Sequence, residues 1–237
     1  MFRSIATALL LLALPAGAAP AADWSDIEGR IQYAWFTEDL RGLRAVLGNL
    51  PRGDADDALR AYYQGFGQYR IALLTQARDR DAARRAAEAC ADRLGQSIEA
   101  RRDFADAIAL HAACLRLVAA LKPWKLPLLG PRSSAQFERA VALAPDNPRV
   151  LLLGAAAGDG PARAIATLGK AIAAFEAERQ GVASLPAWGA PEAYLELARR
   201  EFERGDATAA RAALERALLL APQFEAAKRL LASLTAN

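Results

Sequence analysis

Residues that bind metals or act as catalysts are scarce in this sequence. The 237 residues include a single histidine, His111, and two cysteines, Cys90 and Cys114. A structural zinc site needs four ligands, whereas His111 and Cys114, three positions apart on one predicted helix, supply only two. The phosphate-binding G-x-x-x-x-G-K-[ST], the zinc-binding H-E-x-x-H and the nucleophilic G-x-S-x-G motifs are absent as well. We therefore predict a protein that is not an enzyme, with no catalytic residues, no metal and no cofactor.

Carboxylates leave one enzymatic alternative open. Acidic residues lie close together in several places, for example Glu201 and Glu203. Glycosidases use a pair of carboxylates, so a hydrolase built on such a pair is the weakest of our hypotheses. The spacing of these residues is typical of charges on a solvated helix surface.

The sequence also has few strand-forming residues, and no region of it is dominated by charges of one sign. Alanine and leucine dominate the 54% of hydrophobic residues, aromatic residues make up 7%, and valine and isoleucine are sparse. This composition favours helices over strands. The net charge is +3 and both signs are mixed throughout, which argues against a nucleic-acid partner.

Long apolar runs are missing after the first 22 residues. Residues 1–22 contain one arginine, a short apolar run and a stretch of small residues, which together are typical of a secretory signal peptide. Cleavage would follow Ala18 or Ala22, and an uncleaved membrane anchor is the alternative. We expect a periplasmic or secreted protein with no integral membrane segment after signal cleavage, because no later run reaches 18 uninterrupted apolar residues.

Apolar residues recur at helical spacing from Asp23 onward. This periodicity predicts an N-terminal helical region over 23–121, with long helices near 56–76, 79–100 and 103–121. Pro123, Pro127 and Pro131 predict a proline-rich loop over 122–132. Helical spacing resumes in 133–237, interrupted by a predicted loop at 180–190.

A 34-residue unit is recognisable near the C-terminus. If Pro222 closes the unit, it opens at Pro191, and Gly205-Asp206 forms the turn between its two helices. The core positions of the two helices are then Tyr194, Leu197, Ala198, Ala210, Leu214 and Ala217. Small residues at facing positions let two antiparallel helices approach closely.

This unit resembles the tetratricopeptide repeat, with one departure: an aromatic residue stands at Phe202 where the family has it one position earlier, at Glu201. The resemblance is clear from about residue 133 and faint in the degenerate repeats upstream. As a whole, the chain resembles exported bacterial tetratricopeptide-repeat proteins of unassigned activity. The resemblance implies an all-α, right-handed solenoid of antiparallel helical hairpins.

Such a stack has a concave face that can bind a partner. The resemblance places the partner-binding positions of the best repeat at Glu192, Leu195, Arg199, Phe202 and Glu203. It implies a scaffold or assembly factor that binds a protein or peptide. The alternative is a small-molecule or glycan binder whose pocket is walled by the loops that carry Trp124 and Trp188.

The two cysteines lie 24 residues apart, with the midpoint between two predicted helices. If the chain reverses there, Cys90 and Cys114 lie level on antiparallel neighbours, where a disulfide is feasible. The alternative is a pair of small buried thiols in an alanine-rich interface.

Overall fold

The computed structural model describes residues 23–51, 56–157, 160–180 and 185–235. The predicted signal peptide, 1–22, lies outside these residues. The described part of the chain contains eleven α-helices, one short 3-10 helix and no strand, which confirms the all-α fold class. In order, the elements are α1 (Trp24–Phe36), α2 (Leu40–Gly48), α3 (Asp57–Thr75), α4 (Arg80–Ala100), α5 (Ala105–Leu121), η1 (Pro123–Lys125), α6 (Leu126–Leu143), α7 (Pro148–Ala155), α8 (Pro161–Gln180), α9 (Ala190–Glu203), α10 (Ala207–Leu220) and α11 (Glu225–Thr235).

Short acidic or amide side chains begin many of these helices. An aspartate or asparagine side chain accepts hydrogen bonds from N–H groups of the first turn, which have no partner within the helix. The residues that do so are Asp23, Asp39, Asp56, Asp79, Asn147 and Asp206. The sequence therefore fixes most helix starts locally.

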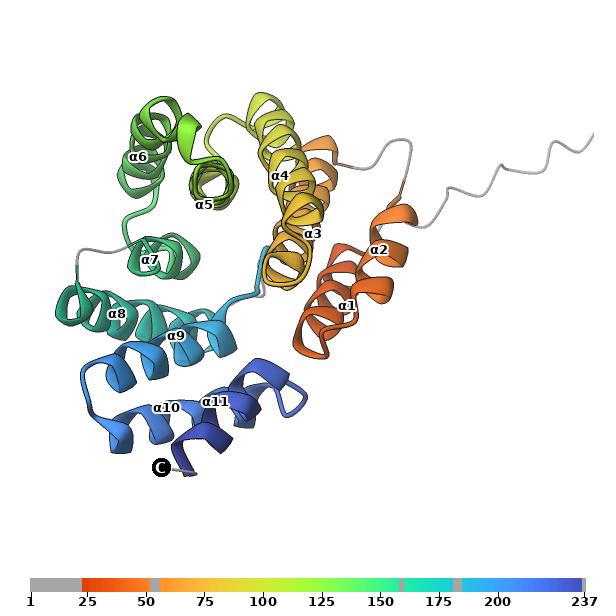
Figure 1. Cartoon of the computed structure of the whole chain (residues 1–237). Helices are drawn as coiled ribbons and strands as arrows, with labels where there is room; N and C mark the ends of the chain where they lie inside the picture. Colours follow the sequence, from red (N-terminus) through yellow and green to blue (C-terminus); the bar gives the residue numbers. More distant parts are fainter. Residues whose placement is uncertain (1–22, 52–55, 158–159, 181–184, 236–237) are drawn as a thin grey trace, which may run out of the picture.

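Consecutive helices pack as hairpins that follow one another around a ring (Figure 1). Alanine allows the close approach: Ala83, Ala87 and Ala109 in the α4–α5 region have no solvent exposure. The chain reverses between Ala100 and Ala105, so that Cys90 within α4 and Cys114 within α5 form a disulfide with their Cα atoms 6.0 Å apart. The α9–α10 hairpin turns at Gly205, whose φ of +88° suits glycine.

The predicted loop over 122–132 is wrong: these residues form η1 and the first turns of α6. Pro123 and Pro127 stand at helix starts, where a missing N–H costs nothing. Only Pro131 lies inside a helix. Tertiary contacts offset its cost, because Leu129 is buried and the buried Ser133 hydroxyl donates to the Ala112 carbonyl over 2.9 Å.

Residues 122–132 do not separate two packing units. One hydrophobic core runs from Trp24 in α1 to Ala193 in α9, and so crosses the expected boundary. A second, smaller core joins Phe36 at the end of α1 to α9, α10 and α11.

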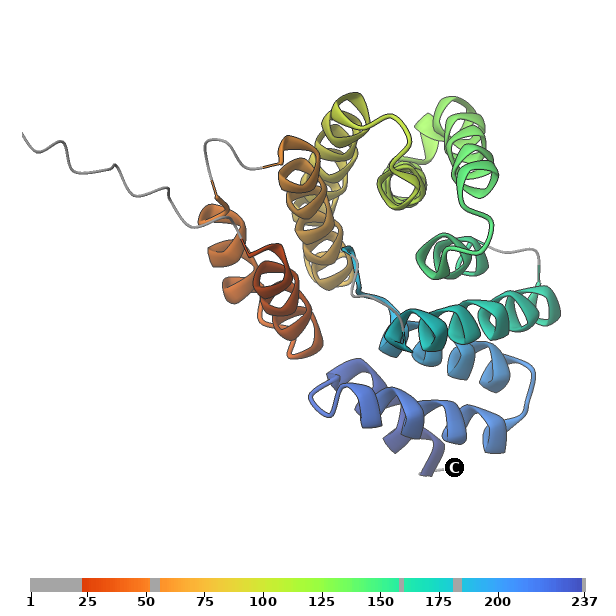
Figure 2. The ribbon, with the colours of Figure 1, turned by 180° about the vertical axis from the view of Figure 1, so that it is seen from behind.

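The two ends of the helical series meet. The ring of Phe36 in α1 lies 4.6 Å from that of Phe224, just before α11, and Arg229 of α11 forms an ion pair with Glu38. The view from behind shows the same closed course of the chain (Figure 2). The first and last described helices are therefore in contact.

Candidate binding pocket

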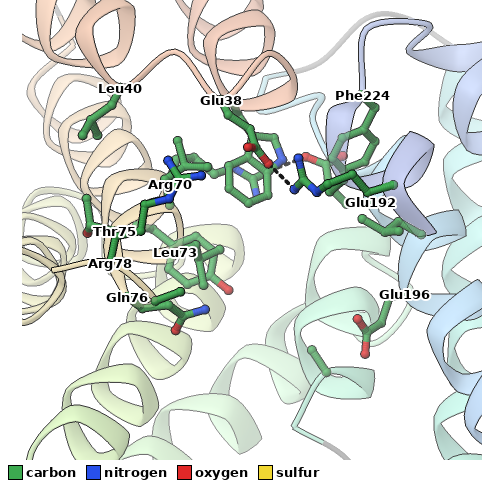
Figure 3. A pocket seen from close by; sticks show the side chains of 18 of the residues that line it. Glu38, Leu40, Arg70, Leu73, Thr75, Gln76, Arg78, Glu192, Glu196 and Phe224 are labelled. Atoms are coloured by element: carbon green, nitrogen blue, oxygen red, sulfur yellow. Dashed lines mark hydrogen bonds and ion pairs between the residues drawn. The ribbon is translucent and has the colours of Figure 1, made fainter. Parts of the chain in front are cut away.

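A cavity of about 520 Å³ lies where the first and last helices meet, which we call the binding pocket. Seven helices contribute side chains to it: α1, α2, α3, α4, α7, α9 and α11 (Figure 3). Its apolar walls come from leucines and aromatic residues, among them Leu73, Leu74, Leu152, Leu153, Leu195, Trp35, Trp188 and Phe224. Concave sites of this size and character are typical of small-molecule binding.

Arg70 of α3 forms the floor of the pocket and is almost fully buried. It makes an ion pair with Glu192 of α9 and donates to the Gln32 side-chain oxygen over 3.1 Å. Gln32 in turn donates to Glu192 over 2.8 Å. Burial lowers the pKa of Arg70, and the Glu192 carboxylate opposes that shift. Three helices are therefore tied together under the pocket by one polar cluster.

Aromatic rings surround the Arg70 guanidinium. Its central carbon lies 4.6 Å from the Trp35 ring centroid, 4.8 Å from that of Phe66 and 5.0 Å from that of Trp188. Phe66 and Trp188 stack on each other at 4.7 Å. A cation held between aromatic faces is restricted in position, so the floor is preorganised.

The floor also holds polar atoms that make no hydrogen bond within the described residues: Trp35 Nε1, Arg70 Nε and Glu192 Oε2. Such orphaned groups are uncommon in buried positions. All three atoms belong to residues that line the binding pocket.

Four arginines stand around the opening of the pocket, at Arg44, Arg78, Arg199 and Arg229, and we call them the rim. Arg229 pairs with Glu38, and Arg199 lies 3.4 Å from Glu196. Within the part of the chain that is described, no ion pair involves Arg44 or Arg78. The rim thus presents guanidinium groups that can bind an anion.

Trp188 is positioned by a separate buried network. Its indole N–H donates to the Tyr62 hydroxyl over 2.7 Å. The neighbouring Ala187 N–H donates to Glu28 of α1 over 3.0 Å, and Tyr63 donates to the same carboxylate over 2.9 Å. Burial raises the pKa of Glu28 to about 7, against the opposing effect of these two hydrogen bonds.

Gly189 completes the placement of Trp188. Its φ of +122° is one that residues with side chains rarely adopt. A Cβ there would also lie 2.5 Å from the Phe175 ring. Glycine therefore lets the chain pass Phe175 and enter α9, which carries Glu192.

Three of the five residues predicted to bind a partner line the binding pocket: Glu192, Leu195 and Arg199. Glu192 is not free to clamp a peptide, because it is buried against Arg70. Phe202 and Glu203 lie outside the pocket, farther along α9, and Glu203 accepts from Arg200 over 3.1 Å.

Of the two tryptophans predicted to wall a pocket, only Trp188 lines the binding pocket. Trp188 is buried and lines the pocket, whereas Trp124 is 73% exposed on η1 and lies elsewhere. Sequence reasoning also missed Arg70. A signal was available: Arg70 follows Tyr62, Phe66 and Tyr69 at helical spacing, so one arginine lies on an aromatic helix face.

A second cavity of about 600 Å³ lies between α2, α3 and α4. Charged and amide side chains such as Asp57, Arg60, Gln96 and Glu99 form much of its lining. It lacks the aromatic walls of the binding pocket. We therefore base the functional argument on the binding pocket.

Metal-binding chemistry is not apparent in the described residues, where no group of three or more His, Cys, Asp or Glu side chains is placed to hold an ion. His111 lies on α5, away from the pocket, and burial lowers its pKa. Among the same residues, no helix combines the length and apolar character needed to cross a bilayer.

Comparison with known proteins gives a likeness among solved structures. No protein-family model matches the chain, and no curated protein sequence matches it. Among solved structures, the chain is similar to the HusA haemophore from Porphyromonas gingivalis, with a TM-score of 0.56 and 19% sequence identity. The match covers 78% of this chain and 96% of the haemophore chain. At this identity the likeness concerns the helical fold.

Proposed function

We propose that this chain is an exported, non-enzymatic binding protein that holds a small amphipathic ligand in the binding pocket. The observation that carries the proposal is the combination of apolar and aromatic walls with unpaired arginines at the rim. An apolar body would displace water from the leucines and aromatic rings, at about 25 cal/mol per Å² of buried apolar surface. An acidic group on the ligand would bind Arg44 or Arg78, because charge-assisted hydrogen bonds to guanidinium are the strong ones.

The closed course of the chain favours a small ligand over an extended peptide. Contact between Phe36 and Phe224 brings the two ends of the helical series together beside the pocket. The segment that carries Trp188 occupies part of the hollow side, fixed through Glu28 and Tyr62. An extended peptide needs a continuous groove, and these contacts interrupt one.

The likeness to a haemophore suggests a first ligand to test. Haem is a flat apolar ring that carries two carboxylates, and it therefore has the chemistry that the pocket and rim would bind. Of the side chains that commonly hold haem iron, only Tyr69 lines the pocket, and burial raises the pKa of that phenol. We therefore expect the iron-free ring, protoporphyrin IX, to bind about as well as haemin.

The experiment is a titration of the mature chain with haemin, protoporphyrin IX and its neutral dimethyl ester. Quenching of Trp35 and Trp188 fluorescence reports binding, with an expected Kd of about 1 µM or tighter for the two acids. The dimethyl ester should bind at least about tenfold more weakly, because it lacks the charges that the rim would pair. No saturable binding of either acid below about 100 µM would overturn the haem-type ligand.

Two matched pairs of variants locate the site. Leu73→Gln changes a pocket wall, whereas Leu219→Gln changes an exposed leucine on α10. Arg78→Glu reverses a rim charge, whereas Arg85→Glu reverses an exposed charge on α4. Only the first member of each pair should weaken binding. Equal effects within both pairs would show that the ligand binds elsewhere.

The tetratricopeptide-like architecture is part of this proposal. The α9–α10 hairpin supports it, because Ala198 and Ala210 are both fully buried and Leu214 fills the space beside them. We propose that the hairpins form a right-handed solenoid of this kind whose ends have closed on each other. In that architecture the pocket lies on the concave face, where the resemblance places partner binding.

Export is supported by the Cys90–Cys114 disulfide, because such bonds persist in oxidising compartments. Fractionation of cells that express the full chain tests it. The mature protein should appear in the periplasm or the medium, shortened by 18 or 22 residues. Recovery of full-length protein from the cytosol would contradict this proposal and leave the pocket unaffected.

A further inference from the structure

Five apolar residues at the junction of η1 and α6 are exposed, and we call them the Trp124 patch. It consists of Pro123, Trp124, Leu126, Pro127 and Leu128. The side chains of Trp124, Leu126 and Leu128 are 73%, 57% and 53% exposed. Single exposed apolar residues are ordinary, whereas a tryptophan and two leucines exposed within five consecutive residues indicate an interaction surface.

The local sequence forces these side chains outward. Leu129 and Ser133 are the residues of this turn that pack against the core, and Ser133 bonds to α5. Pro123 and Pro127 fix the direction of the backbone through η1 into the first turn of α6. Leu126 and Leu128, in the first turn of α6, remain more than half exposed.

Positive charge surrounds the patch. The whole sequence contains four lysines, and two of them, Lys122 and Lys125, flank Trp124. No aspartate or glutamate occurs from residue 107 to residue 137. Glu88 of α4 approaches from the neighbouring helix, but its carboxylate is paired with Lys122. Lys125 and Arg132 take part in no ion pair among the described residues.

We propose that the Trp124 patch docks this protein on the surface of a membrane that contains anionic lipids. Tryptophan is favoured at the level of lipid headgroups, and Leu126 and Leu128 would insert beside it into the acyl boundary. Lys125 and Arg132 would bind lipid phosphates, as cationic side chains next to apolar anchors commonly do.

The positive charge beside the Trp124 patch argues against a second copy of this chain as its binding partner. Two copies joined through this patch would each bring the positive charge of Lys125 and Arg132 into the same interface. Like charges repel, whereas an anionic bilayer complements them. The patch is also separate from the binding pocket, since none of its residues lines that cavity. The proposal therefore stands or falls independently of the proposed ligand.

The test is binding of the mature chain to phosphatidylglycerol–phosphatidylcholine vesicles and to pure phosphatidylcholine vesicles, measured by co-sedimentation. Partitioning should be at least about tenfold stronger on the anionic vesicles and should weaken as salt is raised. Trp124 fluorescence should shift to the blue on binding, and Trp124→Phe should remove that shift while retaining most of the binding.

Variants distinguish this patch from other exposed apolar residues. Leu126→Ser combined with Leu128→Ser should reduce partitioning by about tenfold or more. The matched control, Tyr33→Ser combined with Leu219→Ser, changes two equally exposed residues on α1 and α10 and should have little effect. Lys125→Glu should weaken binding to the anionic vesicles alone.

Circular dichroism and an unchanged midpoint of urea unfolding verify that the variants are folded. Equal binding to the two vesicle types, or binding to neither, would overturn the proposal. Concentration-dependent self-association that the Leu126/Leu128 variant abolishes would instead identify the patch as a contact between copies of this chain, and would also overturn it.

Discussion

Arg70 in α3 and Glu192 in α9 form a buried ion pair although 122 positions separate them in the sequence. Gln32 of α1 bonds to both partners, so the cluster joins the first, third and ninth helices. It lies beneath the binding pocket and beside the contact that closes the ring of helices. This pair therefore links the stability of the fold to the shape of the pocket.

Replacing Arg70 with methionine should destabilise the protein by about 3–5 kcal/mol. Methionine preserves the length and apolar stem of the side chain but leaves the Glu192 carboxylate buried without its cation. Urea unfolding monitored by circular dichroism measures the change, and Arg85→Met on the exposed face of α4 is the control. Adding Glu192→Gln to Arg70→Met should recover part of the loss. A free energy of unfolding that Arg70→Met leaves unchanged would refute the pairing.

Glu28 should make the stability of this protein depend on pH near neutrality. Its pKa is raised from 4.5 to about 7 in the fold, so between these values the folded protein binds a proton that the unfolded chain has released. The contribution of Glu28 is fully present below pH 4.5 and is lost as pH rises through 7. A shift of this size corresponds to about 3 kcal/mol.

The measurement is the free energy of unfolding from pH 5 to pH 8 for the parent protein and for Glu28→Gln. The parent should lose stability across this range relative to the variant, because glutamine does not titrate. Glu138→Gln, which removes an exposed carboxylate, should follow the parent. Parallel curves for the parent and Glu28→Gln would contradict the raised pKa.

Helix positions followed closely from local features of the sequence. The predicted helices at 56–76 and 79–100 correspond to α3 and α4 within one residue at either end. Aspartate caps and apolar periodicity act over a few residues, so a sequence window contains them. The predicted loop over 122–132 is wrong because its prolines alone indicate a loop. The tertiary contacts of Leu129 and Ser133, which no local pattern reveals, stabilise a helix there instead.

The candidate site was predicted only in part, for a related reason. The repeat pattern placed Glu192, Leu195 and Arg199 on one helix face, and that face does line the pocket. Arg70 and Trp35 come from helices that reach the pocket only because the chain closes on itself. Contacts over such sequence distances depend on the curvature of the whole stack, which the residues of a single repeat do not specify.

Removing the disulfide should reduce stability by about 3 kcal/mol. The bond closes a loop of 24 residues, and most of the expected effect comes from restricting the unfolded chain. Reduction with dithiothreitol or the double variant Cys90→Ala/Cys114→Ala should both lower the midpoint of urea unfolding. Because both side chains are buried among alanines, the alanine pair should keep the same far-ultraviolet circular dichroism spectrum. Identical unfolding curves with and without reductant would show that the two thiols are not joined.

Ala210 tests the close packing of the last hairpin. It is fully buried in α10, whereas Ala212, two positions along the same helix, is exposed. Ala210→Leu should force the facing helices apart and destabilise the protein by about 1–3 kcal/mol. Ala212→Leu adds the same side chain with the same helix propensity and should change stability by less than about 0.5 kcal/mol. Thermal and urea unfolding of the two variants would separate packing from propensity. If both substitutions have equal effects, then α9 and α10 do not meet through their small residues, and the repeat-like construction of this hairpin is wrong.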